Sequence, residues 1–152
     1  MEQTLVIIKP DAVQRGLIGN IISRIERRGL KIAEMVMFHC WKELAEQLYI
    51  VHKGKDFFDG QVAFMCSSPI VAMIIEGRNA LSQVRHFVVG SVVNPGTIRG
   101  DFANSVRHNL VHASDSPEAA KYEITCLEIL WKHHHYELDS QKWVYTEEER
   151  SK

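Results

Sequence analysis

The sequence predicts an α/β sandwich, in which helices pack on a single β-sheet, and three observations support this fold class. Four short segments have the apolar, branched composition of strands. Segments with apolar residues three and four positions apart, which is the helical spacing, separate these strands. No linker rich in Pro, Gly or Ser divides the chain, so we expect a single domain over residues 1–152, with a divergent C-terminal tail over residues 128–152.

The N-terminal part of the chain predicts a strand, a helix and a second strand. Leu5–Ile8 is a branched run typical of a strand buried on both faces, and Pro10 ends it because proline cannot donate to a sheet ladder. Isoleucines at helical spacing mark a helix over Ile18–Ile25, which stops at Gly29. Residues 31–39 form the second predicted strand.

Helices and a third strand follow. Residues 41–52 predict a helix, residues 62–66 a short helical piece and residues 70–76 a strand. Asn79 is expected to cap the helix that comes next, because asparagine is a preferred N-cap residue.

The second half predicts the rest of the sheet. Residues 90–100 contain Asn94-Pro95-Gly96 and predict an irregular loop, and residues 110–111 predict the fourth strand. Ser116-Pro117 marks a strong helix start, since serine caps and proline favours the first helical position. Two strand–helix–strand halves in one small domain favour a ferredoxin-like sandwich, a four-stranded antiparallel sheet with helices packed on it.

Composition and charge exclude several classes of protein. Hydrophobic residues make up 45% and charged residues 24% of the chain, which is ordinary globular usage and excludes disordered or collagen-like proteins. A net charge of −1 argues against a dedicated nucleic-acid surface or a membrane-surface role, so any bound anion needs a local basic cluster. The longest apolar run, Ile70–Ile75, is far shorter than the roughly 20 residues of a membrane span.

The three cysteines and the N-terminus predict the compartment. Cys40, Cys66 and Cys126 are odd in number, widely spaced and without a CxxC pair, so we expect reduced, buried thiols. The chain starts without a basic segment followed by an apolar one, and we therefore expect a cytoplasmic protein.

His112 is the strongest candidate for chemistry. It follows the fourth predicted strand and precedes a helix cap, a place where anions gather. A neutral imidazole can act as a nucleophile when its second nitrogen is held by an acceptor. Glu123, in the following helix, could fold back to that role, and Ser114 could add a hydrogen bond. A structural histidine with satisfied hydrogen bonds is the alternative.

Cations at element ends suggest a phosphate site. Lys9, Arg85 and Arg99 each lie near a strand or helix end, where the positive side chains of a phosphate-binding site are expected. Three solvated surface cations are the alternative. Thr97 adds a hydroxyl beside Arg99, and the P-loop motif GxxxxGK[ST] is absent from the sequence.

Two further features are open to interpretation. Phe57 and Phe58 could stack on a planar base, or they could belong to the core. Residues 133–135 are three consecutive histidines, which point in different directions and are therefore interpreted as surface. A histidine-rich metal-binding module is a weaker alternative for this triplet.

Three stretches of the sequence resemble the nucleoside diphosphate kinases: residues 8–13, residues 95–102 and residues 109–116. The resemblance covers about residues 3–127. It implies a ferredoxin-like fold, homo-oligomers built from dimers, and Mg²⁺-dependent transfer of the γ-phosphate of a nucleoside triphosphate, such as ATP or GTP, to a nucleoside diphosphate, such as ADP.

The resemblance also implies roles for individual residues. His112 resembles the phosphorylated nucleophile of a ping-pong mechanism, and Glu123 and Ser114 resemble its supports. Phe57 resembles the ring that stacks on the base. The metal is expected to be held mainly by the nucleotide phosphates rather than by protein ligands. The residues that resemble the phosphate and sugar contacts are Lys9, Tyr49, Arg85, Thr97, Arg99 and Asn109.

The sequence also departs from the family pattern. Leu48 replaces a usual histidine, and Ala113 replaces a usual glycine. The loop between Arg85 and Pro95 is shorter than in most of the family, so Arg85 and His86 compete for one arginine position, and an ungapped count favours Arg85.

Two classes of function follow from the sequence. The first is an active kinase, and the second is a non-catalytic nucleotide-binding or scaffolding protein on the same fold. The enzyme is favoured because the residues that would separate the two classes are all present, namely Lys9, Arg99, Asn109, His112 and Glu123.

Overall fold

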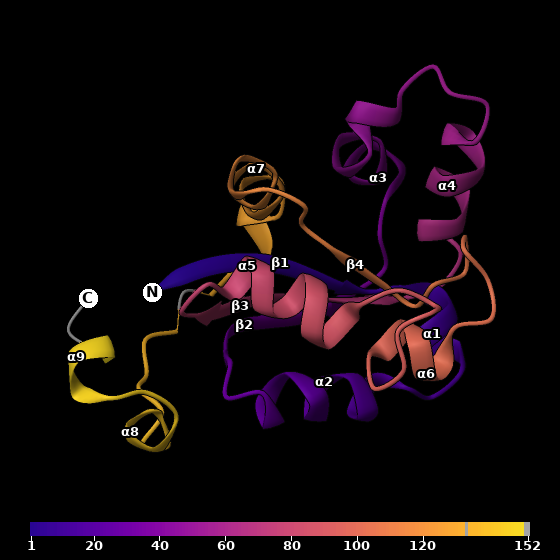
Figure 1. Ribbon diagram of the computed structural model, residues 1–152. Coiled ribbons are helices and arrows are strands. Elements are labelled where there is room, and N and C mark those ends of the chain that lie inside the picture. Colours follow the sequence, from indigo (N-terminus) through magenta and orange to yellow (C-terminus); the bar gives the residue numbers. More distant parts are fainter. Residues whose placement is uncertain (133, 151–152) are drawn as a thin grey trace.

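A computed structural model describes residues 1–132 and 134–150 and shows one four-stranded antiparallel sheet with the order β2-β3-β1-β4 (Figure 1). This confirms the predicted ferredoxin-like sandwich and its four strands. The strands are β1 (Glu2–Ile8), β2 (Lys31–Phe38), β3 (Ile70–Gly77) and β4 (Val111–Ala113).

Helices cover both faces of the sheet. In Figure 1, α3, α4 and α7 lie above the sheet and α2 lies below it. Within the described part of the chain, no helix has the length and apolar composition needed to cross a membrane. The α-helices are α1 (Pro10–Gln14), α2 (Ile18–Arg27), α3 (Lys42–Leu48), α4 (Phe58–Met65), α5 (Ala80–Ser82), α6 (Ile98–Phe102), α7 (Pro117–Cys126), α8 (Gln141–Val144) and α9 (Glu147–Arg150). Three other helical segments are η1 (Ile50–His52), η2 (Gln83–Val89) and η3 (Glu128–Leu130).

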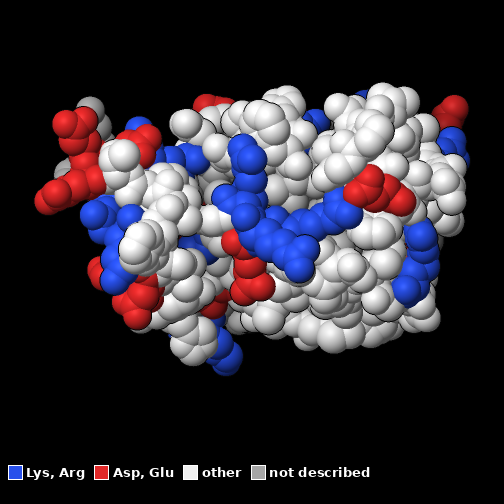
Figure 2. Space-filling view, turned by 60° about the horizontal axis from the view of Figure 1, so that its bottom comes forward, with Lys and Arg blue, Asp and Glu red and all other residues white. Residues whose placement is uncertain are grey.

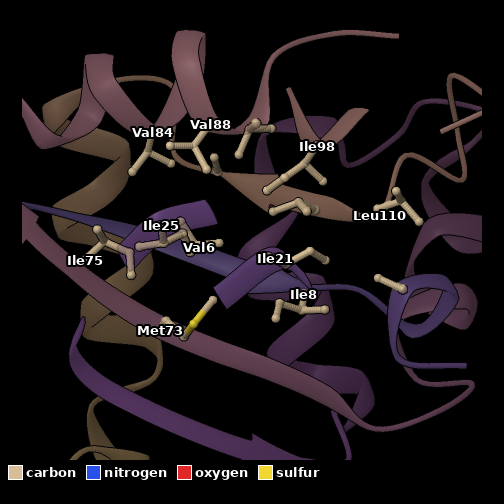
Figure 3. Close-up of a cluster of buried hydrophobic side chains, with 14 of the residues drawn as sticks. Val6, Ile8, Ile21, Ile25, Met73, Ile75, Val84, Val88, Ile98 and Leu110 are labelled. Atoms are coloured by element: carbon tan, nitrogen blue, oxygen red, sulfur yellow. The ribbon is translucent and has the colours of Figure 1, made fainter. Parts of the chain in front are cut away.

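Strand β1 explains why the core has two halves. Its residues alternate between the faces of the sheet, and all four of its last residues are buried, as the sequence predicted. Val6 and Ile8 pack with α2, η2 and α6 (Figure 3), whereas Leu5 and Ile7 pack with α3 and α4. The sheet is therefore buried on both faces along its central strand.

Ion pairs and cation–π contacts connect the helices below the sheet. A band of Lys and Arg side chains, with acidic side chains beside it, crosses this face (Figure 2). Arg24 in α2 forms an ion pair with Asp101 (2.5 Å), and its guanidinium lies 4.7 Å from the centre of the Phe102 ring. Arg28 lies over the ring of Phe87 at the same distance. Both arginines therefore have partners within the fold.

The structure corrects three details of the predicted elements. Pro10 does more than end a strand, because it opens the short helix α1. Asn79 holds the N-cap position with φ 50° but makes no capping hydrogen bond; instead the Glu2 carboxylate accepts the Leu81 N–H at 3.0 Å. Helix α6, which Thr97 caps, begins within the predicted loop over residues 90–100. A contact from a distant segment at Asn79 and an unrecognised cap at Thr97 decided the local structure in the last two cases.

The start of α7 confirms the predicted signal. The Ser116 hydroxyl accepts the Ala119 N–H at 3.0 Å, and Pro117 is the first helical residue. The end of α2 is also as predicted, since Gly29 has φ 81°, a conformation that glycine adopts without strain. Strand β4 and α7 are thus joined by a short, well-defined turn.

The C-terminal segment lies against the edge strand β2. The buried carboxylate of Glu34 accepts the backbone N–H groups of Lys132 (3.3 Å) and His134 (2.7 Å), and Tyr136 donates to the Ile32 carbonyl. Of the histidine triplet, His133 lies outside the described residues, so the metal-binding alternative cannot be placed there.

Candidate active site

One cavity of about 1050 Å³ opens beside the C-terminal end of β1. Its walls come from α3, α4, the segment before β4, and the start of α7. It brings together most of the residues that the sequence singled out. The predicted site residues that line it are Lys9, Tyr49, Phe57, Arg85, Arg99, Asn109, His112 and Glu123.

His112 lies on β4 and is held by a carboxylate. It pairs in register with Ile7 of β1, which fixes its position along the strand. Its Nε2 is 2.9 Å from Oε1 of Glu123, a residue of α7 that is 6% exposed. The second Glu123 oxygen accepts the Ser114 hydroxyl at 2.5 Å. A neutral His112 that donates from Nε2 keeps its lone pair on Nδ1.

Ser114 is itself fixed by the sheet. Its backbone N–H donates to the Leu5 carbonyl at 3.2 Å, and its hydroxyl oxygen lies 3.4 Å from the Leu5 N–H. It is fully buried behind the cavity wall. Ser114 therefore anchors Glu123, and through it the imidazole, to strand β1.

Tyr49 closes the cavity beside the histidine. Its ring meets the His112 ring edge-on, with 6.0 Å between centroids and 82° between planes. Burial raises the pKa of the Tyr49 hydroxyl to about 12, so the phenol stays protonated at neutral pH.

Lys9 is a buried cation at the end of β1. Its Nζ donates to Asn109 Oδ1 (2.7 Å) and to the Arg107 carbonyl (3.0 Å). Burial lowers the pKa of Lys9 to about 8; the nearby Asp11 carboxylate opposes this shift and Arg99 adds to it. A buried amine of this kind gains from an anion placed beside it.

Two guanidinium groups flank His112 on β4. Arg99 donates to the Val111 carbonyl at 2.6 Å, and Arg85 donates to the Ala113 carbonyl at 3.1 Å. Burial lowers the pKa of Arg99, and the neighbouring Arg85 adds to the shift, although arginine remains charged. Of the two competing residues, Arg85 lines the cavity and His86 is exposed.

Thr97 occupies a different place from the other predicted residues. Its hydroxyl donates to the Asn94 carbonyl (2.6 Å) and accepts the Gly100 N–H (3.1 Å), which caps α6. It is not among the residues that line the cavity. Gly90, with φ 62°, packs so closely on Thr97 that a Cβ there would lie 2.3 Å from its hydroxyl oxygen. The structure gives Thr97 a capping contact rather than a place in the wall.

The aromatic pair divides between the mouth of the cavity and the core. Phe57 is 39% exposed at the cavity, whereas Phe58 is buried. The His52 ring lies 5.4 Å from the Phe57 ring, and the Lys55 ammonium lies 5.7 Å from its centre. Phe57 thus presents a supported ring to whatever enters the cavity.

Sequence reasoning missed several residues of the cavity wall. Gln61 lies four residues after Phe57, and Phe64 lies three residues after Gln61, so all three share one helical face, and this spacing could have revealed them. Val106, Arg107 and His108 have no such local signal. His108 stacks on Phe64, with 4.7 Å between centroids and 10° between planes. Three more residues of the wall were not predicted from the sequence, namely His52, Asp56 and Asp115.

The described residues of the cavity form no metal-binding cluster of their own. Among the side chains that the structure describes, no three His, Cys, Asp or Glu residues gather in a group that could hold a metal ion. The cavity offers cations and a carboxylate-supported imidazole, together with neutral groups such as Asn109 and with the carboxylates of Asp56, Asp115 and Glu118. Such a lining suits a ligand that carries several phosphates.

A ferredoxin-like sheet with a carboxylate-supported histidine and a cluster of cations around one cavity defines a nucleotide-binding phosphotransferase. Residues 2–129 match the family described as nucleoside diphosphate kinase, and the chain belongs to this family. It is an enzyme that transfers the terminal phosphate of a nucleoside triphosphate to a nucleoside diphosphate.

Individual relatives support this assignment. A nucleoside diphosphate kinase of Ignicoccus hospitalis is 52% identical over 82% of this chain and 87% of its own length. One from Archaeoglobus fulgidus is 46% identical over 97% of this chain and 99% of its own. A solved structure of a halophilic nucleoside diphosphate kinase from Halobacterium salinarum in complex with CDP has a TM-score of 0.88 and 41% identity, and the match covers 95% of this chain and 98% of that chain. The non-catalytic alternative is not favoured.

Proposed function

We propose that His112 carries the phosphoryl group between the two nucleotides. Its Nδ1 attacks the γ-phosphorus, the N–P bond forms, and the P–O bond to the leaving nucleoside diphosphate breaks with its electron pair. The phosphohistidine then gives its phosphoryl group to a second nucleoside diphosphate by the reverse displacement. The observation that carries this proposal is the 2.9 Å contact of His112 Nε2 with Glu123, because it leaves Nδ1 as the nitrogen with a free lone pair.

The cations supply the remaining requirement of phosphoryl transfer. This reaction depends mainly on positioning and on neutralising phosphate charge. Lys9, Arg85 and Arg99 surround the histidine and would exchange some of their present carbonyl contacts for phosphate oxygens. Asn109, already bound to Lys9, and Tyr49 complete the group that faces the phosphates and the sugar. Thr97 contributes by fixing the position of Arg99 through the α6 cap.

The base is proposed to stack on Phe57. A stacking platform accepts every base, because each base has a π-face. ATP, GTP and ADP would all be substrates, and the CDP bound to the Halobacterium salinarum relative agrees with a pyrimidine as well. We therefore expect the enzyme to tolerate many bases.

Mg²⁺ is proposed to enter with the nucleotide. Mg²⁺ in nucleotide sites keeps several waters and binds phosphate oxygens together with one or two carboxylates, so it needs no cage built from protein alone. The cavity fits this mode, since Asp115 and Glu118 line it without forming a closed group. When bound, the metal would neutralise charge on the phosphates. Chelation should abolish transfer, and added Mg²⁺ should restore it.

Assembly and location are further parts of the proposal. We expect a homo-oligomer of at least two copies, in which residues 1–152 act as one domain, in the cytoplasm. The three cysteines are free, and thiols stay reduced in that compartment. Light scattering at micromolar concentration should give at least twice the monomer mass, and a stable monomer would contradict this.

Initial-rate kinetics test the proposed mechanism. One site that serves both half-reactions requires the first product to leave before the second substrate binds. Double-reciprocal plots at several fixed concentrations of the second nucleotide should therefore give parallel lines. Intersecting lines would mean that both nucleotides bind at once, and this would remove His112 as an intermediate carrier.

A further inference from the structure

The backbone just before His112 adopts an unusual turn. Leu110 has φ 73°, which is a conformation that residues other than glycine rarely adopt. The Val111 N–H donates to the Asn109 carbonyl at 2.8 Å, so these three residues form a γ-turn of the positive-φ form, which is rare and strained. Strain of this kind persists only where surrounding contacts enforce it.

The side chain of Leu110 explains only part of this enforcement. It is fully buried in the core cluster below the sheet, beside Ile98 and Ile21 (Figure 3). More than one backbone conformation can place a leucine side chain in this part of the core, because the side chain can change rotamer. The polar groups of the turn must therefore supply the rest.

Both backbone polar groups of Leu110 are held by the junction of β1 and α1. Its N–H donates to Oδ2 of Asp11 at 3.0 Å, and its carbonyl accepts the backbone N–H of Lys9 at 2.9 Å. The contact with Asp11 is the one that comes from a side chain, and it spans 99 residues of sequence. The sheet would keep the Lys9 contact without any particular side chain, so Asp11 is the residue whose identity matters.

The other oxygen of Asp11 adds nothing to the stability of the fold. Its Oδ1 is buried and has no hydrogen-bond partner among the described residues. A buried carboxylate oxygen without a partner destabilises the folded state. Such a cost is typical of groups retained at functional sites.

The turn connects two residues of the proposed site. Asn109 precedes Leu110 and holds Lys9 Nζ at 2.7 Å, and His112 follows two residues later on β4. A change of φ at Leu110 would swing Asn109 away from Lys9 and alter the entry of the chain into β4. The turn is thus the joint that sets the relative positions of these groups.

We propose that Asp11 is a positioning residue for phosphoryl transfer: by binding the Leu110 N–H, its carboxylate holds the strained turn that aligns Asn109 and His112 in the cavity. This inference rests on the proposed role of His112. It assigns to Asp11 no contact with the nucleotide. A displacement of about 1 Å in such a group can lower a rate by about 10²-fold.

The test compares variants at both ends of this hydrogen bond. Asp11→Ala should lower the single-turnover rate of phosphohistidine formation at saturating ATP by about 10²-fold. Asp11→Asn keeps an acceptor in place without the charge and should stay within about tenfold of the wild type. Asp11→Glu keeps the charge but moves the oxygens, and it should lose more activity than Asp11→Asn. This order would show that position, rather than charge near Lys9, is what Asp11 supplies.

Changes at Leu110 provide the rescue. Leu110→Gly and Leu110→Ala remove nearly the same core contacts, but only glycine adopts positive φ without strain. Asp11→Ala should therefore lower the rate much less in the Leu110→Gly background than in the Leu110→Ala background. Thermal melts establish the temperature at which each variant is folded, and if Asp11→Ala does not fold, Asp11→Glu replaces it in both backgrounds.

The outcomes separate this inference from the proposed function. Equal losses in the two backgrounds, or an unchanged rate in folded Asp11→Ala, would overturn the role of Asp11 while His112 labelling in the wild type stands. Absence of label on wild-type His112 would instead remove the proposed function itself.

Discussion

Oε1 of Glu123 lies 2.9 Å from Nε2 of His112, while its second oxygen accepts the Ser114 hydroxyl at 2.5 Å. Helix α7 supplies the carboxylate and strand β4 supplies both of its partners. Because both carboxylate oxygens have partners, the imidazole has one favoured orientation and one favoured tautomer. The imidazole is therefore already oriented in the structure without a bound nucleotide, as the proposed mechanism requires.

Removal of this support should slow the reaction without abolishing it. Glu123→Ala should lower kcat by about 10–100-fold, by analogy with the groups that orient metal-binding histidines. Glu123→Gln keeps an acceptor for the His112 N–H and should lose less. Steady-state kcat at saturating nucleotide measures both effects. A Glu123→Ala enzyme with the wild-type kcat would show that the contact is dispensable.

The buried ammonium of Lys9 predicts an alkaline limit to activity. Its pKa is lowered to about 8, so it loses its positive charge as the pH rises through that value. In the proposed mechanism this charge holds phosphate, and kcat/KM, which reports the free enzyme, should therefore fall above about pH 8. Asp11→Asn should move this limb to lower pH, since the Asp11 carboxylate raises the pKa of Lys9. A flat profile up to pH 10 would contradict the role of Lys9.

The exposed ring of Phe57 predicts how the base is bound. Phe57→Ala should weaken nucleotide binding by about 1–3 kcal/mol, the range measured for stacking of one base on one aromatic ring. The effect should be similar for ATP and GTP, and Phe57→Tyr should retain binding. Donor kcat/KM values for ATP and GTP in the wild type should agree within about tenfold. A preference of many thousandfold would reveal a contact to the base edge.

The two hydrogen bonds of the Thr97 hydroxyl predict a stability effect. Thr97→Val removes the cap of α6 at nearly constant volume and should lower the free energy of unfolding by about 0.5–2 kcal/mol. Thr97→Ser keeps the hydroxyl and should retain most of the free energy of unfolding. Chemical denaturation measures the difference. If Thr97→Val keeps its stability but raises the KM for nucleotide, the hydroxyl touches substrate directly.

Local signals were enough to predict much of the fold. The branched run Leu5–Ile8 and the Ser116-Pro117 start act through nearest neighbours, and both appear in the structure as predicted. Asn79 failed as a cap because its backbone is left-handed rather than extended, and Glu2, which lies far away in sequence, accepts the Leu81 N–H instead. The preference of a residue type for the N-cap position does not determine which side chain binds the N–H groups of the helix.

The site was predicted less evenly than the fold. The helix after His112 pointed to Glu123, positions at element ends pointed to the cations, and the fold brings these side chains to one cavity. The positive φ of Leu110 could not be predicted, because leucine avoids this conformation and its partner Asp11 lies 99 residues away. The Phe64–His108 stack likewise depends on tertiary structure.

Transfer of label through His112 tests the central claim most directly. The purified protein would be incubated with γ-³²P-ATP and Mg²⁺, separated from nucleotide, digested and mapped, and then exposed to unlabelled GDP. We predict acid-labile, alkali-stable label on the peptide that contains His112, its full passage to GTP, and no label in His112→Ala, with His108→Ala as the control that still labels. Label on another residue, or full exchange activity in His112→Ala, would contradict the account.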